Sequence, residues 1–263
     1  MKHPSMRVVL GLALLVPAVG MAQDRSGLLL PMPSNIVIGG TTGRAQPGVS
    51  ASSPLGFGPN FGDVFIGAAY QARARYTTLD DGSASFGFGL GNSSKIVGLE
   101  VVITSLSTVR EGFFKRTAGG FKLHRMLTSS AAIGVGVEDV KISGATDSKQ
   151  SYYVALSKYA QIGTGNTFNA VVLNIGAGNG RFQSEDNFFA GKNDFNVFGS
   201  AGLRVTSWLG AIADWTGQDL NLGASVVPLK QFPIIITPVI ADVTQSAGDG
   251  ARFTIGFGAS WHF

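Results

Sequence analysis

Acid–base or nucleophilic catalysis usually needs a histidine beside a hydroxyl or a carboxylate, and this chain has only His3, His124 and His262. His3 lies in a leader-like stretch, and His262 is the next-to-last residue. His124 has Ser129 and Ser130 nearby, but they fall in a turn at the other end of its expected strand. No nucleophile–histidine–acid constellation and no metal-ligand spacing emerges. The sequence therefore predicts no catalytic site, no metal and no cofactor.

Two further motifs carry no chemistry. The glycine-rich run 176–180 lacks the Lys-Ser/Thr that follows a phosphate loop, and the sequence predicts no strand-to-helix context around it. The acidic fragments 80–82, 185–187 and 249–251 could suggest divalent cations, but Asp, Asn and Gly are also the ordinary residues of turns. We interpret them as turns.

A row of polar side chains that alternate with apolar ones forms the main candidate site. If the apolar rows face lipid, these residues line the inside of a barrel, and Arg73 and Arg75 fall on the first strand. Charged rings select ions, so one interpretation is a channel constriction in which these two arginines attract anions. The other is an internal salt-bridge network, because charges in a narrow space must be paired. The candidates are Gln71, Arg73, Arg75, Glu100, Lys122, His124, Glu138, Arg204, Asp214, Asp219 and Asn221.

Composition limits the class of protein. Charged residues make up only 14% of the chain, below the quarter typical of soluble domains, and 37 glycines suit many strands and tight bends. The absence of cysteine excludes disulfides and thiolate metal sites. Lys2 and Arg7 belong to the leader, so the net charge of +4 becomes 4 − 2 = +2 for the remaining chain. That small excess gives no basis for nucleic-acid binding.

The chain divides into three parts. Residues 1–22 have a positive start, an apolar core and a small-residue cleavage site, which predicts a secretory signal peptide. Residues 23–60 are rich in Pro, Gly and Ser without a sustained period, which predicts a flexible N-terminal segment. From residue 61 to 263 the chain consists of short alternating segments, which predict one β-barrel.

Alternation of apolar and polar residues predicts about twelve strands, with ten as the alternative. The least regular is 233–243, which is apolar on both faces and contains Pro238. A soluble β-sandwich is the competing architecture, but the leader and the low charge speak against it. The expected strands are 63–76, 84–91, 96–106, 119–127, 131–142, 150–158, 167–177, 194–206, 208–216, 218–228, 233–243 and 251–263.

The last strand alternates to the final residue, with Phe257, Trp261 and Phe263 on one face and Gly256 and Gly258 on the other. In this it resembles the bacterial outer-membrane β-barrel proteins, whose last strand ends in an aromatic residue; no closer family is indicated. The resemblance implies that these three aromatics form the signal read by the barrel-assembly machinery. It also implies export through the periplasm, contact with periplasmic chaperones and a final place in outer-membrane lipid.

Connection lengths agree with this class, in which long loops lie outside and short turns inside. The three longest connections, around 107–118, 143–149 and 178–193, all fall on the expected outer side. The connection 159–166 is longer than an inner turn usually is. Trp208, Trp215, Trp261, Tyr70 and Phe253 fall near strand ends, where an aromatic girdle would meet the headgroups.

Glycines cluster on the inward faces of the first, second and last strands, which pair around a closed barrel. Residues 28–30 or 36–38 could lie against this smooth wall and narrow the interior; alternatively the glycines only permit sharp curvature. The glycines are Gly67, Gly87, Gly89, Gly91, Gly256 and Gly258.

The sequence thus predicts an outer-membrane barrel that acts as a small porin-like channel for passive diffusion of solutes or ions. The alternative is a structural or surface-interaction barrel with a closed interior, whose loops 107–118 and 178–193 contact a partner. An outer-membrane hydrolase is disfavoured by the histidines. The sequence defines neither a solute nor an oligomeric state.

Overall fold

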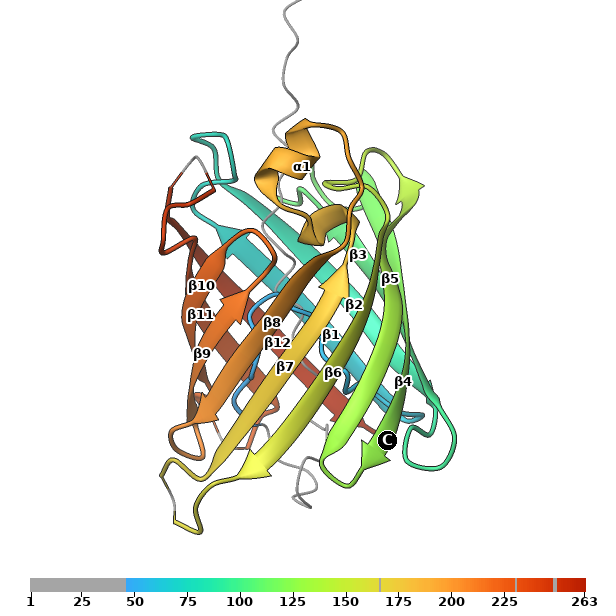
Figure 1. Ribbon diagram of the computed structural model, residues 1–263, viewed down its shortest axis with the longest axis vertical. Coiled ribbons are helices and arrows are strands. Elements are labelled where there is room, and N and C mark those ends of the chain that lie inside the picture. Colours follow the sequence, from blue (N-terminus) through green and yellow to red (C-terminus); the bar gives the residue numbers. More distant parts are fainter. Residues whose placement is uncertain (1–45, 166, 230, 248–249) are drawn as a thin grey trace, which may run out of the picture.

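Twelve antiparallel strands form a closed barrel in the computed structural model, which describes residues 46–263 except 166, 230 and 248–249 (Figure 1). Each strand pairs with its neighbours in the chain, and β1 pairs with β12 to close the ring. This confirms the predicted fold class and the higher strand count. The strands are β1 (Asp63–Gln71), β2 (Asp81–Gly91), β3 (Gly98–Leu106), β4 (Arg116–Thr128), β5 (Ala131–Ser143), β6 (Ser151–Gln161), β7 (Ala170–Gly178), β8 (Asn196–Arg204), β9 (Leu209–Trp215), β10 (Leu220–Val226), β11 (Ile234–Ala241) and β12 (Arg252–His262).

The first strand is shorter than predicted. It ends at Gln71, whereas the alternation had suggested strand up to residue 76. Beyond it, Thr77 N–H donates to the carbonyl of Ala74, and Tyr76 has a left-handed φ of 60°. The chain therefore turns before residue 76, and the placement of Arg73 and Arg75 on the first strand was wrong.

Pro238 was expected to weaken the eleventh strand, and the pairing of β10 with β11 shows where. Gly223 is paired with Val239, and the next pair is Val226 with Ile236. Residues 237 and 238 of β11, which include Pro238, are therefore unpaired on this side. A proline has no N–H to donate, which explains the gap. On its other side β11 pairs with β12 continuously, including Pro238 opposite Ile255.

The barrel is apolar outside and polar inside. On β7, Leu173 and Ile175 point outward with 53% and 59% of their surface exposed, while Asn174 between them is buried. On β12, Phe253, Phe257 and Trp261 are exposed, and the alternate residues are buried up to Ser260. Such a distribution is the reverse of a soluble domain and fits a barrel surrounded by lipid.

The two ends of the barrel differ. One end carries the connections 179–195 and 242–251, and the other carries the short turn 129–130 together with the C-terminus (Figure 1). We call them the α1 end and the C-terminal end. Connection 179–195 contains the 3-10 helix η1 (Gly180–Phe182) and the helix α1 (Glu185–Phe189), which lie across the barrel opening. The long connections 107–115 and 179–195 lie at the α1 end, as predicted. Two connections depart from this pattern: 162–169 at the C-terminal end has eight residues, and 216–219 at the α1 end has only four.

No helix in the described ranges is both long and apolar enough to cross a membrane. The aromatic residues predicted to form girdles are all exposed and lie at or near strand ends. Their exposed fractions are 38% for Tyr70, 45% for Trp208, 40% for Trp215, 43% for Phe253 and 45% for Trp261.

Replacement of an outward residue tests the lipid-facing surface. Leu173→Arg, near the middle of β7, should lower the free energy of unfolding by about 2–4 kcal/mol in lipid vesicles, because a cation there must enter hydrocarbon. Urea titration followed by tryptophan fluorescence measures it. Leu229→Arg is the control, since Leu229 is similarly exposed (47%) but lies outside the strands. Equal effects of both replacements would contradict a lipid-facing belt.

Candidate functional site

The interior of the barrel contains most of the polar residues selected from the sequence. Arg73 is half-buried at the rim of the α1 end, where its guanidinium donates to the carbonyls of Gly250 and Ala251. Glu138 and Arg204 are half-buried. The fully buried ones are Gln71, Arg75, Glu100, Lys122, His124, Asp214, Asp219 and Asn221.

Glu100 and Lys122 form an ion pair across neighbouring strands. They face each other in the register of β3 and β4, and Lys122 Nζ lies 2.6 Å from Glu100 Oε2. Their side chains are 10% and 7% exposed, so neither charge is well solvated. At this position the interior behaves as a paired network rather than as a ring of free charge.

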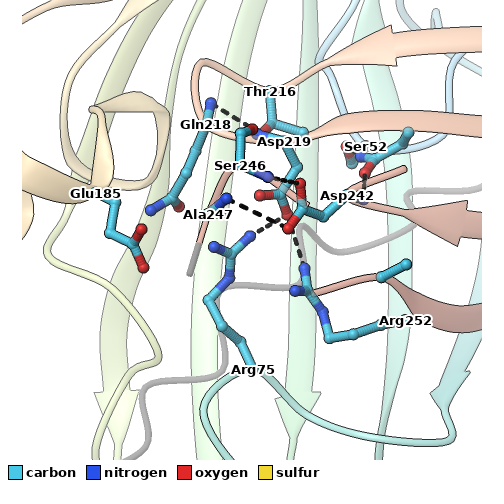
Figure 2. A network of polar contacts seen from close by, with 12 residues as sticks. Ser52, Arg75, Glu185, Thr216, Gln218, Asp219, Asp242, Ser246, Ala247 and Arg252 are labelled. Atoms are coloured by element: carbon cyan, nitrogen blue, oxygen red, sulfur yellow. Dashed lines mark hydrogen bonds and ion pairs between the residues drawn. The ribbon is translucent and has the colours of Figure 1, made fainter. Parts of the chain in front are cut away.

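A second network lies near the α1 end, where one carboxylate serves two arginines (Figure 2). Asp219 Oδ2 accepts hydrogen bonds from Arg75 and from Arg252 Nη2, the latter at 2.7 Å. Both arginine side chains are at most 1% exposed. Arg252 was not among the predicted residues, although it has the same parity on the last strand as the inward Thr254.

Tyr76 connects this region to the helix above it. Its hydroxyl donates to Glu185 of α1, and its ring lies 5.6 Å from that of Phe189. Burial, together with this hydrogen bond, raises the pKa of Tyr76 to about 12. The hydroxyl therefore remains a neutral donor at physiological pH and keeps α1 attached to connection 72–80.

The largest feature of the interior is a chain segment, residues 46–60, which we call the luminal segment. Most of its residues are buried inside the barrel, among them Val49, Leu55 and Phe57. Those three side chains pack with Ala132 of β5 and Val172 of β7 in one apolar cluster. Residues 46–60 were therefore wrongly expected to be flexible. Their conformation is defined by contacts with the barrel, and such contacts leave no periodic pattern of apolar residues in the sequence.

Asp214 of β9 is the main polar contact of the luminal segment. One carboxylate oxygen, Oδ2, accepts hydrogen bonds from the backbone N–H groups of Ala51, Ser52 and Ser53 at 2.9, 3.0 and 3.1 Å. The hydroxyls of Ser50 and Ser53 add bonds of 2.7 and 2.6 Å. Asp214 is completely buried, so the segment takes the place of water around its charge.

Further hydrogen bonds follow the segment around the inner wall. From its N-terminal to its C-terminal part it meets β10, then β7 and β6, and then β4. The bonds are Gly48 N–H to Ser225 Oγ (2.6 Å), Asn174 Nδ2 to Pro54 carbonyl (3.0 Å), Gly56 N–H to Ser157 Oγ (2.8 Å) and His124 Nε2 to Pro59 carbonyl (2.9 Å).

Glycines make room for this course. A Cβ on Gly202 of β8 would lie 2.5 Å from the Cα of Val49, and one on Gly58 would lie 2.6 Å from the ring of His124. On the far side of that ring, Gly98 faces His124 in the β3–β4 register and would also meet it. The imidazole therefore lies between two glycines, one on the wall and one on the segment.

The predicted glycine wall is only partly used in this way. Gly89 faces Pro59 and Asn60 at the end of the luminal segment, while Gly87 faces the ring of Phe65, which points inward from β1. Residues 28–30 and 36–38, which were proposed to cover this wall, lie outside the described residues.

Aromatic side chains fill another part of the interior. Phe182 of η1 stacks on Phe198 of β8 with ring centroids 4.4 Å apart, and Tyr153 of β6 packs edge-on against both. Arg181, next to Phe182, forms an ion pair with Glu138 and donates to the carbonyl of Ser52 at 2.9 Å. Connection 179–195 therefore contacts the luminal segment directly.

A cavity of about 70 Å³ remains beside these groups, lined mainly by β1–β5. A bulge in β5 brings the adjacent residues Glu138 and Asp139 to it together, and Asp139 has a φ of 57°. Arg181 is the basic residue of the lining.

Both histidines of the barrel contact an oxygen acceptor. His124 is in contact with the Pro59 carbonyl, and His262 Nδ1 lies 2.8 Å from Asp63 Oδ1 at the β1–β12 seam. In the described part of the chain, no group of three or more His, Cys, Asp or Glu side chains could hold a metal ion.

The comparisons with known proteins are sparse. No family model matches the chain, and no curated protein is similar to it. Among solved structures, the crystal structure of the Acinetobacter baumannii outer membrane protein Omp33 aligns with 76% of this chain and 97% of its own, at 12% identity and a TM-score of 0.39. A likeness of this size supports no inference about activity.

Loss of one partner of the Glu100–Lys122 pair should leave a buried charge without compensation. We expect Lys122→Met to lower the free energy of unfolding by about 3–5 kcal/mol, measured by urea titration in vesicles. Glu100→Gln combined with Lys122→Met should restore most of that loss, because both charges are then gone. If the double variant is as unstable as the single one, the pair does not account for the effect.

Proposed function

We propose that this protein is exported to a bacterial outer membrane and acts there as a porin-like channel for small solutes or ions. The conducting path runs through the space that the luminal segment occupies. The observation that supports this most is that the barrel encloses a stretch of main chain in addition to its own side chains. Side chains alone fill an eight-stranded barrel, whereas sixteen strands leave a channel.

The luminal segment is separate from the wall of the barrel. The bridge from Phe61 to Gly89 lies just beyond its last residue, and among the described residues the twelve strands pair with each other. The backbone of the wall is therefore hydrogen-bonded without the segment, as a spanning barrel requires. Removal of the segment would expose polar residues such as Asn174, Ser157 and Asp214, which water can solvate.

A closed-lumen barrel with a structural or surface-interaction role is the second candidate. The Glu100–Lys122 pair and the two arginines on Asp219 support it, because they resemble the paired interior of a filled barrel. In that case connections 107–115 and 179–195 at the α1 end would contact a partner. The role of Phe257, Trp261 and Phe263 in recognition by the assembly machinery, and the help of chaperones, remain predictions under either function.

Truncation distinguishes the two candidates. A chain that lacks residues 23–58 should give steady conductance in planar bilayers at least tenfold above that of the chain starting at residue 23, because a water-filled path replaces the segment. Folding is checked by heat-dependent gel mobility.

The matched control lacks only residues 23–45 and keeps the luminal segment. It should conduct as little as the longer chain. A folded 23–58 truncation without conductance would rule out the channel and favour the closed barrel.

A further inference from the structure

The luminal segment has the properties of a ligand held in a binding site. Its contacts with the wall consist of hydrogen bonds to single side chains and of apolar packing, without a shared ladder. The wall provides a recess for it at Gly202, where any side chain would collide with Val49. The most concentrated recognition is at Asp214, where residues 50–53 surround one carboxylate.

We propose that the luminal segment is a detachable strap that closes the barrel from inside, with Asp214 as its latch. The inside of the barrel is thus a binding site for this serine-containing peptide. Closure of a conducting path rests on the proposed channel function, but the binding of the segment as a separable peptide does not.

Release of the segment changes the surroundings of Asp214 most. When residues 50–53 leave, the buried Asp214 carboxylate loses its protein donors and must be solvated by water that enters the barrel. When they return, three consecutive N–H groups converge on one oxygen, an arrangement that binds anions in many proteins. Each hydrogen bond to a charged group is worth about a tenfold to hundredfold change in an equilibrium, so Asp214 should dominate the balance between closed and open states.

The segment carries no charge, which distinguishes it from a voltage-driven gate. Residues 46–60 contain no Asp, Glu, Lys, Arg or His. A transmembrane potential acts on charge, so it exerts almost no direct force on this stretch. Closure by the strap should therefore depend little on the sign or size of the applied voltage.

Release would begin at the N-terminal end of the luminal segment. At its C-terminal end the segment is held next to β1, where Asn60 N–H donates to Asp63 and Asn60 Oδ1 accepts from Ser93 N–H. Residues 50–53, which bind Asp214, lie earlier in the luminal segment. The strap can thus come off residue by residue from position 48 while its last residues and the seam remain in place.

The test supplies the strap as a separate peptide. A fluorescein-labelled peptide of residues 46–60 is titrated against the barrel lacking residues 23–58, and binding is followed by fluorescence anisotropy. The control peptide carries Ser50→Ala, Ser52→Ala and Ser53→Ala. Because the covalent strap acts at an effective concentration of about millimolar, the free peptide should half-saturate the barrel at millimolar concentration or below. The control should bind at least tenfold more weakly.

Two variants of the uncut protein test the latch and the recess. Asp214→Asn keeps the size of the side chain but turns an NH2 group toward the donors of the strap. Gly202→Val places a side chain where Val49 lies. Each should raise the open probability in planar bilayers at least tenfold, and added peptide should block the truncated barrel equally at both voltage polarities. Ala201→Val is the matched control, since Ala201 is exposed on the outer face of β8 and should leave the barrel closed.

The outcomes are separable. Peptide binding that depends on the serines of the peptide supports the strap even if no form of the barrel conducts, in which case the channel function is wrong. A truncated barrel that conducts but neither binds nor is blocked by the peptide overturns the strap and leaves the channel intact. If the truncated barrel conducts, Asp214→Asn and Gly202→Val barrels that stay as closed as Ala201→Val would also overturn the strap.

Discussion

Closure of β1 onto β12 is the constraint on which the rest of this structure depends. A strand edge in lipid would leave a row of N–H and C=O groups without partners, so a barrel must be complete. Completion fixes the parity of every strand, because side chains alternate between the two faces. Once the outer face is apolar, the inner face must contain nearly all of the polar residues.

A polar interior then creates a second requirement, since charges enclosed by the wall are far from bulk water. Three solutions occur side by side. Lys122 is paired with Glu100, Asp219 is shared by Arg75 and Arg252, and Asp214 is surrounded by main-chain and hydroxyl donors. The third solution differs from the others because the donors come from a segment that is not part of the wall. The barrel can lose it without losing a strand.

The wall could be predicted from the sequence because its rule is local. An alternation of period two is visible in any single strand, and even Pro238 only interrupts one ladder instead of removing β11. Alternation fails to predict the structure where local and tertiary preferences disagree. Residues 72–76 continue the alternation of β1 but turn away, so Arg73 and Arg75 were assigned to the wrong element. Arg252 could have been found by parity, since it lies two residues before the inward Thr254.

The luminal segment could not be predicted in the same way. Its Pro, Gly and Ser residues resemble those of a linker. The segment contacts five or more different strands, and such contacts produce no repeating pattern of apolar and polar residues. Its only sequence trace is indirect: inward glycines such as Gly202 and Gly98 leave space that a barrel filled by its own side chains would not need. Curvature explains such glycines equally well when the sequence is read alone.

The position of the luminal segment in the chain explains how it can be held at one end and released at the other. It directly precedes β1, and its last residue, Asn60, is attached beside the seam through its hydrogen bond to Asp63 of β1. A segment tethered at the seam and latched at β9 crosses the interior, so that one attachment can open while the other holds. The absence of charge in residues 46–60 also favours reversible binding, because a charged side chain would add its own desolvation cost inside the barrel. Backbone N–H groups and serine hydroxyls form hydrogen bonds with Asp214 and can return to water without a large penalty.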